Sequence, residues 1–450
     1  MRRLLRISAS GWSIVPIVML LLSNALGQDR SPPEARQDSE TVDPQEARVA
    51  RLVTRLGSDS YLDREAADAA LAKIGRPSRG QLEAASDAQD AEIRLRARRL
   101  LSRLKVSDLW SPTTVVLSKP NLNVSQALEE IAAQTGNHVL VGEEFGEFNN
   151  RMLLLDTSPT TFWEAIDEVC RQSENHVRPL FDPRPGVMMI AGASGKQPVA
   201  YSGPLRAYIT GARRVFTEQL DYNRLTSDTE HTFKIDMKIL WEDRFRLVAY
   251  RKAPQLIEAV TDTGKKLLPV KRASGRDVWN VTSSGMRHVS ASIALRPPAL
   301  SDGELDRFKL EWNMIAVGDM ATIDVTDLES KQPRHGDHLE LVVEKVGKVR
   351  RSDHYVVTVL ILRDLIVPEP REILQHENRL ELFDSEGRRF KPQGASSVLF
   401  DRGVRVTARF RMPTADAKPD RLQISYPRIR DQRTLEIEFR HVPIPIAKPE

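Results

Sequence analysis

The chain has 450 residues, which is too long for one ordinary hydrophobic core, so we expect about three or four domains. With 40% hydrophobic and 28% charged residues, its composition is globular and excludes the collagen-like and disordered classes. The 66 basic residues nearly balance the 62 acidic ones, and the net charge of +4 argues against a dedicated nucleic-acid binder. The single cysteine excludes an intramolecular disulfide and a thiolate metal cluster.

Residues 1–27 have the three parts of a secretory signal peptide. Arginines at the extreme N-terminus supply positive charge, an apolar run follows over residues 12–22, and Ala25-Leu26-Gly27 offers small residues to a signal peptidase. The run is shorter than the ~20 apolar residues that span a membrane, so cleavage is favoured over retention as an anchor. No cysteine follows the run, which excludes a lipid-anchored form. We therefore expect a protein that is secreted or periplasmic, without stable membrane insertion after cleavage.

A linker and a helical domain are predicted next. Residues 28–43 are polar and aperiodic, as in a flexible linker. Asp43-Pro44 then begins the first helix with an N-cap acid and a first-turn proline. Further helices are predicted from Ser60, from Pro77 and over residues 87–105, because apolar residues recur there at helical spacing.

The last of these helices resembles the inner helix of a HEAT-like repeat. The resemblance lies in Asp90-x-Glu92-Ile93-Arg94-x-x-Ala97. It identifies residues 44–106 as a HEAT-like domain. Members of that family stack helical pairs into a solenoid, which implies that so short a stack is capped by its neighbour or by a partner.

The same helix carries a run of basic side chains, namely Arg94, Arg98, Arg99, Arg103 and Lys105. One interpretation is a site for a phosphate-rich polymer or an anionic surface. We favour a solvated face paired with nearby acids, since charge runs usually solvate a helix. The expected acidic partners are Asp87, Asp90 and Glu92.

Residues 113–192 predict the order strand, helix, strand, strand, helix, strand, strand. This order, with the segments Ala127–Asn137 and Ala165–Val169, resembles the short N-terminal (STN-like) domain shared by secretins and TonB-dependent receptors. The resemblance implies two small βα units that share a sheet and make protein–protein contacts in the bacterial envelope. It brings no catalytic residue. Nothing downstream resembles a secretin ring or a membrane β-barrel, so the secretion and receptor roles do not carry over by themselves.

Candidate reactive residues in this module have simpler interpretations. Cys170 lies on the apolar stripe of a predicted helix without a basic neighbour, so we expect a core thiol rather than a redox sensor or nucleophile. His138 and His176 each begin a predicted strand, which suits a structural role better than metal binding. Gly195-Lys196 follows in a linker, but the preceding glycine of a phosphate loop is absent.

The remaining chain contains an internal repeat, predicted as residues 204–329 and 337–443. Five segments recur in the same order: Phe233–Leu240 with Tyr355–Leu362, Leu256–Val260 with Arg379–Phe383, Val289–Ala291 with Val406–Ala408, Asp306–Trp312 with Asp420–Tyr426, and Ile323–Val325 with Ile437–Phe439. Short alternating strands between turn signals predict two immunoglobulin-like β-sandwiches. The turns Asp262-Thr263-Gly264 and Ser385-Glu386-Gly387 each contain one acidic residue, which supplies too few oxygen ligands for a calcium site.

Only one segment places two histidines and a carboxylate together, His335-Gly336-Asp337-His338. It suggests a surface zinc or copper site, but four ligands are not visible and we favour a polar loop between the repeats. The Gly-x-Ser-x-Gly, His-Glu-x-x-His and Gly-x-Gly-x-x-Gly signatures are missing. We therefore predict no catalytic, cofactor or metal site.

Together these features predict a multidomain fold: a helical HEAT-like pair, a small α+β domain and two duplicated β-sandwiches. The expected function is non-catalytic protein–protein interaction in the bacterial cell envelope, with a protein partner and no nucleic acid. The first alternative is an accessory role in an envelope secretion or transport assembly. The second is a polysaccharide-acting hydrolase, which the 6% aromatic content disfavours, since such sites combine aromatic platforms with paired carboxylates.

Overall fold

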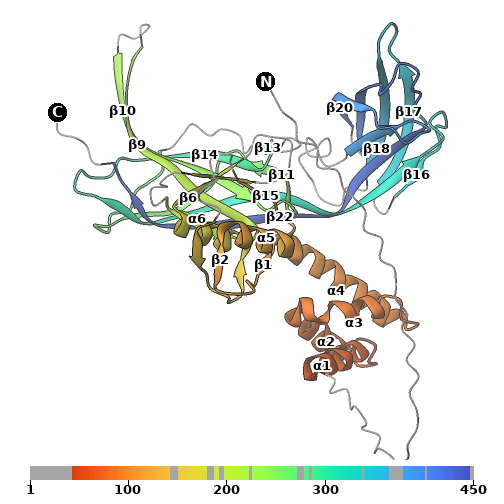
Figure 1. The fold of residues 1–450 in the computed structure, drawn as a ribbon, viewed down its shortest axis with the longest axis horizontal. Coiled ribbons are helices and arrows are strands. Elements are labelled where there is room, and N and C mark those ends of the chain that lie inside the picture. Colours follow the sequence, from red (N-terminus) through yellow and green to blue (C-terminus); the bar gives the residue numbers. More distant parts are fainter. Residues whose placement is uncertain are drawn as a thin grey trace, which may run out of the picture.

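A computed structural model of the chain is mostly β, with several antiparallel sheets (Figure 1). The β-rich part of the predicted fold is therefore confirmed. The residues that the structure describes are 43–141, 150–179, 187–191, 197–221, 226–270, 278–282, 286–336, 339–363, 379–400 and 403–445. None of the helices among these residues is long and apolar enough to cross a membrane. The predicted signal peptide and linker lie outside them.

The helical region begins the described chain. Its elements are α1 (Pro44–Arg55), α2 (Tyr61–Ile74), the 3-10 helix η1 (Arg76–Ser78), α3 (Arg79–Ala85) and α4 (Ala91–Trp110). Asp43, Ser60 and Asp90 cap α1, α2 and α4, because each side chain accepts a hydrogen bond from a first-turn N–H. The apolar faces meet in one core that includes Leu71 and Leu100.

In each of the two helical pairs, α1–α2 and α3–α4, an arginine of the second helix also binds the loop that leads into it. Arg64 donates to the carbonyl oxygens of Ser58 and Asp59 at 2.7 and 3.1 Å, just before α2 begins. Arg94 does the same before α4, with carbonyls of residues 88 and 89 at 2.6 and 3.2 Å. An arginine one turn inside each second helix thus holds the loop that enters it.

Helix α4 runs further than the predicted end at Lys105. Asp90 caps its start, and its last residue, Trp110, is only 4% exposed because it inserts into the β-region. The indole packs edge-on against Phe245, with ring centroids 5.1 Å apart, and donates to Asp431 at 2.9 Å. This anchor ties the helical region to the body of the molecule (Figure 1).

The small module (residues 113–191) follows α4. Its elements are β1 (Thr114–Val115), β2 (Asn121–Asn123), α5 (Val124–Thr135), β3 (Val139–Val141), β4 (Met152–Leu154), β5 (Thr160–Thr161), α6 (Phe162–Ser173), β6 (Asn175–Pro179) and β7 (Val187–Ala191). The first βα unit contains β1, β2 and α5, and the second contains β4, β5 and α6. They exchange strands, since β1 pairs with β5 and β2 pairs with β4. Strand β7 lies between β3 and β6.

The rest of the described chain forms two β-regions. Their strands are β8 (Val199–Ser202), β9 (Leu205–Asp221), β10 (Thr226–Trp241), β11 (Arg246–Arg251), β12 (Gln255–Thr261), β13 (Trp279–Val281), β14 (His288–Leu295), β15 (Glu304–Val325), β16 (Arg334–His335), β17 (Leu339–Lys348), β18 (His354–Arg363), β19 (Arg379–Phe383), β20 (Lys391–Phe400), β21 (Gly403–Arg411) and β22 (Arg421–Pro443). One sheet has the order β14-β10-β9-β8 and another β16-β17-β18-β21-β20. Both face a third sheet that contains β15 and β22.

The long strands β15 and β22 belong to both β-regions. Leu310 pairs with Ile437 in the core of the first region. Ile424, the repeat counterpart of Leu310, pairs with Ile323 in the second. One half of β22 therefore completes the core of the first β-region, and one half of β15 completes the core of the second. The boundaries 204–329 and 337–443 follow the sequence repeat but do not separate two structural units, because the antiparallel ladder continues across them.

Equivalent turns in the two predicted repeats have the same backbone conformation and the same backbone hydrogen bond. Gly264 and Gly387 both adopt positive φ, 82° and 76°, which glycine tolerates without steric cost. After each turn a backbone N–H returns to the preceding strand at 2.8 Å, from Leu267 to Ala259 and from Phe390 to Leu382. These backbone hydrogen bonds hold both turns.

Candidate functional site

The two βα units of the small module begin their helices in the same way. Asn123 and Gln126 form a reciprocal capping box at α5, and Thr161 and Glu164 form one at α6. Each N-cap side chain accepts from the third helical N–H, and the third side chain reaches back to the N-cap N–H. The units are therefore equivalent in detail, and a role found in one can be sought at the matching position of the other.

Two glutamines close the strand edges of the module. The Gln134 amide accepts from the Val116 N–H at 2.9 Å and donates to its carbonyl at 2.8 Å. Gln172 makes the same pair of bonds with Leu154, at 2.7 and 2.6 Å. An open strand edge recruits further strands by β-augmentation. Here the side-chain amides already bind backbone N–H and carbonyl groups that an added strand would use.

The outer face of β4 carries an exposed apolar pair. Met152 is 62% and Leu154 71% exposed, whereas Leu153 between them faces the core, as expected from the alternation of a strand. Their cross-strand neighbours on β2 are Asn123 and Asn121. This contact face, Asn121, Asn123, Met152 and Leu154, contains no charged residue. Large exposed apolar side chains grouped in this way are typical of protein-binding surfaces.

An acidic turn joins the first unit to the β-region. Glu242 is buried and accepts from both the N–H and the hydroxyl of Thr113 at 2.9 Å. The next residue, Asp243, donates its N–H to the Asn137 side chain at 2.7 Å and accepts from the His138 N–H at 2.9 Å. His138 thus holds this turn through its backbone, and its Nδ1 lies 3.4 Å from the Asp243 carboxylate.

A buried ion pair joins the second unit to the β-region. Asp167 on α6 accepts from Arg206 at 2.7 Å and from the Tyr201 hydroxyl at 2.6 Å. Burial and the Asp167 charge raise the pKa of Tyr201 above its usual range, so its hydroxyl remains a donor. Nearby, burial and then Asp167 raise the pKa of Cys170 to about 12. The thiol is buried in the module's core and stays protonated at neutral pH.

The other predicted candidates lie only partly within the described residues. His335 lies at strand β16, whereas Asp337, His338 and the Gly195-Lys196 pair lie outside the described residues. His176 is the second residue of strand β6, which begins at Asn175. Within the described part of the chain, no group of three or more His, Cys, Asp or Glu side chains is arranged to hold a metal ion.

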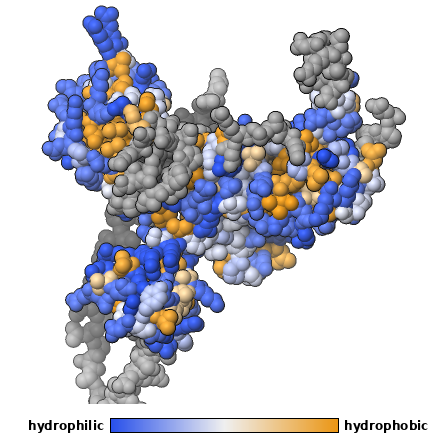
Figure 2. Space-filling view, turned by 180° about the vertical axis from the view of Figure 1, so that it is seen from behind, coloured by the Kyte–Doolittle hydropathy of each residue, from blue (hydrophilic) through white to orange (hydrophobic). Residues whose placement is uncertain are grey.

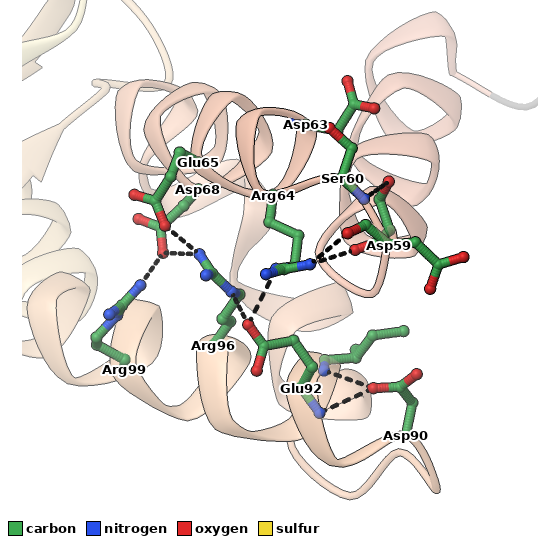
Figure 3. Close-up of polar contacts among 12 residues, drawn as sticks. Asp59, Ser60, Asp63, Arg64, Glu65, Asp68, Asp90, Glu92, Arg96 and Arg99 are labelled. Carbon is green, nitrogen blue, oxygen red and sulfur yellow. Dashed lines mark hydrogen bonds and ion pairs between the residues drawn. The ribbon is translucent and has the colours of Figure 1, made fainter.

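Four of the five basic residues named for α4 are paired with acids, mainly not those expected, whereas Arg94 binds backbone carbonyls. Lys105 pairs with Asp319 at 2.8 Å. Figure 3 shows Arg96 between α2 and its own helix, with Glu65 at 2.8 Å and Glu92 at 2.6 Å. Buried Asp68 accepts from Arg99 at 2.7 Å and from Arg103 at 3.0 Å. The hydrogen bond from Arg96 lowers the pKa of the Glu92 carboxyl.

Of the predicted acidic partners, Asp87 binds Arg98 at 3.4 Å, and Asp90 is used as the cap of α4. Sequence reasoning missed Asp68 and Arg96, whose only signal is an acid and a base on facing stripes of two predicted helices. The face of the helical region seen in Figure 2 is mainly hydrophilic, consistent with these pairs.

A cleft of about 500 Å³ lies where the helical region meets the small module. Its lining includes apolar residues of α2 and α4 and the polar residues Arg76, Arg103, Asp108 and Thr114. Asp108 is engaged by Arg76 and, at 3.2 Å, by Arg79. Arg103 is engaged by Asp68, outside the cleft. The charged groups of the cleft are thus already paired, and the cleft is a joint between regions rather than a prepared ligand site.

No protein-family model, curated protein or solved structure matches this chain. What it does is therefore inferred from its own residues.

Proposed function

We propose that this chain is an exported, non-catalytic protein that binds other proteins in the bacterial cell envelope. The signal-peptide pattern of residues 1–27 supports export. The STN-like small module, the HEAT-like helical region and two immunoglobulin-like β-regions would form one framework for presenting binding surfaces. The observation that carries the proposal is the contact face on β2 and β4.

The contact face has the composition of an interface centre. Met152 and Leu154 offer apolar area, while the Asn121 amide offers hydrogen bonds without the desolvation cost of charges. Because Gln172 occupies the edge of β4, a partner would bind across the face through side chains rather than extend the sheet.

The helical region offers a second apolar surface. Tyr61 and Leu62 on α2 and Leu95 on α4 are more than half exposed. A stack of only two helical pairs leaves faces that a longer solenoid would cover. An accessory role in an envelope assembly is the more specific form of the same proposal, and the STN-like resemblance favours it.

The test is partner capture by cross-linking in the native host, followed by mass spectrometry. The Met152→Asp/Leu154→Asp double variant should capture each partner in an amount at least about tenfold lower than the wild type does, because anchor residues of an interface contribute a few kcal/mol to binding. Leu300→Asp, at an exposed apolar residue between β14 and β15, is the matched control and should retain them. Unchanged capture by the double variant, with an unchanged melting temperature, would refute the contact face. Hydrolysis of envelope polysaccharide by the purified chain would refute the non-catalytic proposal.

A further inference from the structure

Each unit of the small module has one buried asparagine at the end of its helix. Among the described residues, the side-chain amide is hydrogen-bonded in the first unit and has no partner in the second. Asn137 follows Gly136, which ends α5 in the left-handed conformation at φ 69°. Asn175 follows Glu174, which ends α6 in the same conformation at φ 58°. The two asparagines are 1% and 2% exposed. They occupy matching positions at the ends of matching helices.

In the first unit this amide is fully engaged. The Asn137 Oδ1 accepts from the backbone N–H of Asp243 at 2.7 Å, and its Nδ2 donates to the Thr113 hydroxyl at 3.3 Å. In the second unit, neither Oδ1 nor Nδ2 of Asn175 finds a hydrogen-bond partner in the part of the chain that the structure describes. A buried unpaired amide is unfavourable, and each such group in a native protein calls for an explanation.

The surroundings of the two amides match in part, although Asn175 already lies in a strand, paired with Ala191, and Asn137 precedes one. Thr113 precedes β1 and Arg151 precedes β4, and His138 and His176 each follow the asparagine. In the first unit, Thr113 and His138 hold the carboxylates of Glu242 and Asp243. Arg151 places a cation where Thr113 is neutral, and it lies 3.3 Å from the exposed Glu174 carboxylate. The second unit therefore has a cation, paired with an exposed carboxylate, at the position where the first unit has a neutral threonine.

We propose that the second unit is a docking site for a Glu-Asp turn of a partner protein, held by Asn175 and Arg151 as the first unit holds Glu242-Asp243. The turn's backbone N–H would donate to the Asn175 Oδ1, and its glutamate would displace Glu174 from Arg151. The inference deepens the proposed function, because the contact face begins at Met152, directly after Arg151. Asn175 is covered in the free chain, so docking must first expose it, which slows association.

The probe is a fluorescent cyclic peptide that copies residues 240–245, Leu-Trp-Glu-Asp-Arg-Phe, titrated with the full chain and followed by fluorescence anisotropy. We expect saturable binding with one peptide per chain. A peptide with Gln and Asn in place of Glu and Asp should bind at least tenfold more weakly. Arg151→Glu should also weaken binding at least tenfold.

Asn175→Leu separates docking from stability. It should weaken peptide binding at least tenfold while the melting temperature stays the same or rises, since it removes an unpaired buried amide. A purely structural Asn175 would instead give a lower melting temperature and unchanged peptide binding, which overturns the inference. Absence of peptide binding to the wild type also overturns it. In either case, loss of partner capture by the Met152→Asp/Leu154→Asp variant would leave the proposed function standing.

Discussion

The Arg206 guanidinium lies 2.7 Å from the Asp167 carboxylate, across the boundary between the first β-region and the small module. Arg206 is 5% exposed, so its charge has little access to water. Burial opposes the charged guanidinium, but Asp167 outweighs this and raises the pKa of Arg206. The pair is the buried charged link between the two regions on the side of the second unit, beside the polar contacts that Glu242 and Asp243 make with the first unit.

Removing one member of this pair should therefore be costly. Asp167→Ala leaves a buried arginine uncompensated, and we expect a loss of about 3–5 kcal/mol in the free energy of unfolding. Urea denaturation measures the loss, and maleimide labelling of Cys170 should become faster as the interface loosens. The control is Asp167→Leu/Arg206→Met, which removes both charges and should recover most of the stability. Equal stability of Asp167→Ala and the wild type would show that the pair contributes nothing.

His441 should make stability depend on pH near neutrality. It lies 2.8 Å from Glu304, where the far end of β22 meets the start of β15, and this carboxylate raises the pKa of His441. The folded-state pKa lies above the unfolded value, so the stabilisation is fully present below about pH 6.5 and is lost as pH rises through the folded pKa.

The measurement is the melting temperature from pH 5.5 to 8.5 for the wild type and His441→Asn. Asparagine tolerates the φ of 53° at this position. The difference between the two proteins should be largest at the acid end and shrink toward pH 8.5. A difference that is constant over this range would contradict the ion pair.

Opening a strand edge should cause self-association. Gln172→Leu frees the N–H and carbonyl of Leu154, next to the exposed apolar face of β4. We expect concentration-dependent oligomers in light scattering coupled to size exclusion, because unprotected edges pair with other strands. Gln89→Leu, at an exposed position before α4, is the control and should remain at the wild-type mass. Identical mass profiles for the two variants would show that the clamp does not protect the edge.

The first repeat should not fold without the second. A fragment of residues 204–329 lacks the half of β22 that supplies Leu435, Ile437 and Phe439 to the core of the first β-region. Losing one such side chain typically costs about 2–5 kcal/mol, so losing all of them exceeds the stability of an ordinary domain. Circular dichroism and proton NMR should show an unfolded fragment. Adding a peptide of residues 421–445 should restore β-structure, and a fragment that folds alone would contradict strand sharing.

Local features of this protein are readable from its sequence. Asp43-Pro44 predicts the start of α1, and the phrase ending in Gly136-Asn137 predicts the end of α5. Burial of Cys170 also follows from its place on an apolar stripe. In each case the deciding contacts join residues within about one or two turns of the chain, so spacing and residue type are sufficient. The duplication of the β-regions is visible for the same reason, as a recurring order of short patterns.

Only the tertiary structure decides how these pieces combine. That Ile437 completes the core of the first repeat, or that Asp68 binds Arg99 and Arg103, depends on the register between distant elements. Register in a long antiparallel ladder is selected by the summed packing of both faces, which no local pattern encodes. The same holds for the candidate site: the sequence by itself predicts, by resemblance, a module for protein contacts. The fold determines that Gln172 closes its edge and that the Asn175 amide stays unpaired among the described residues.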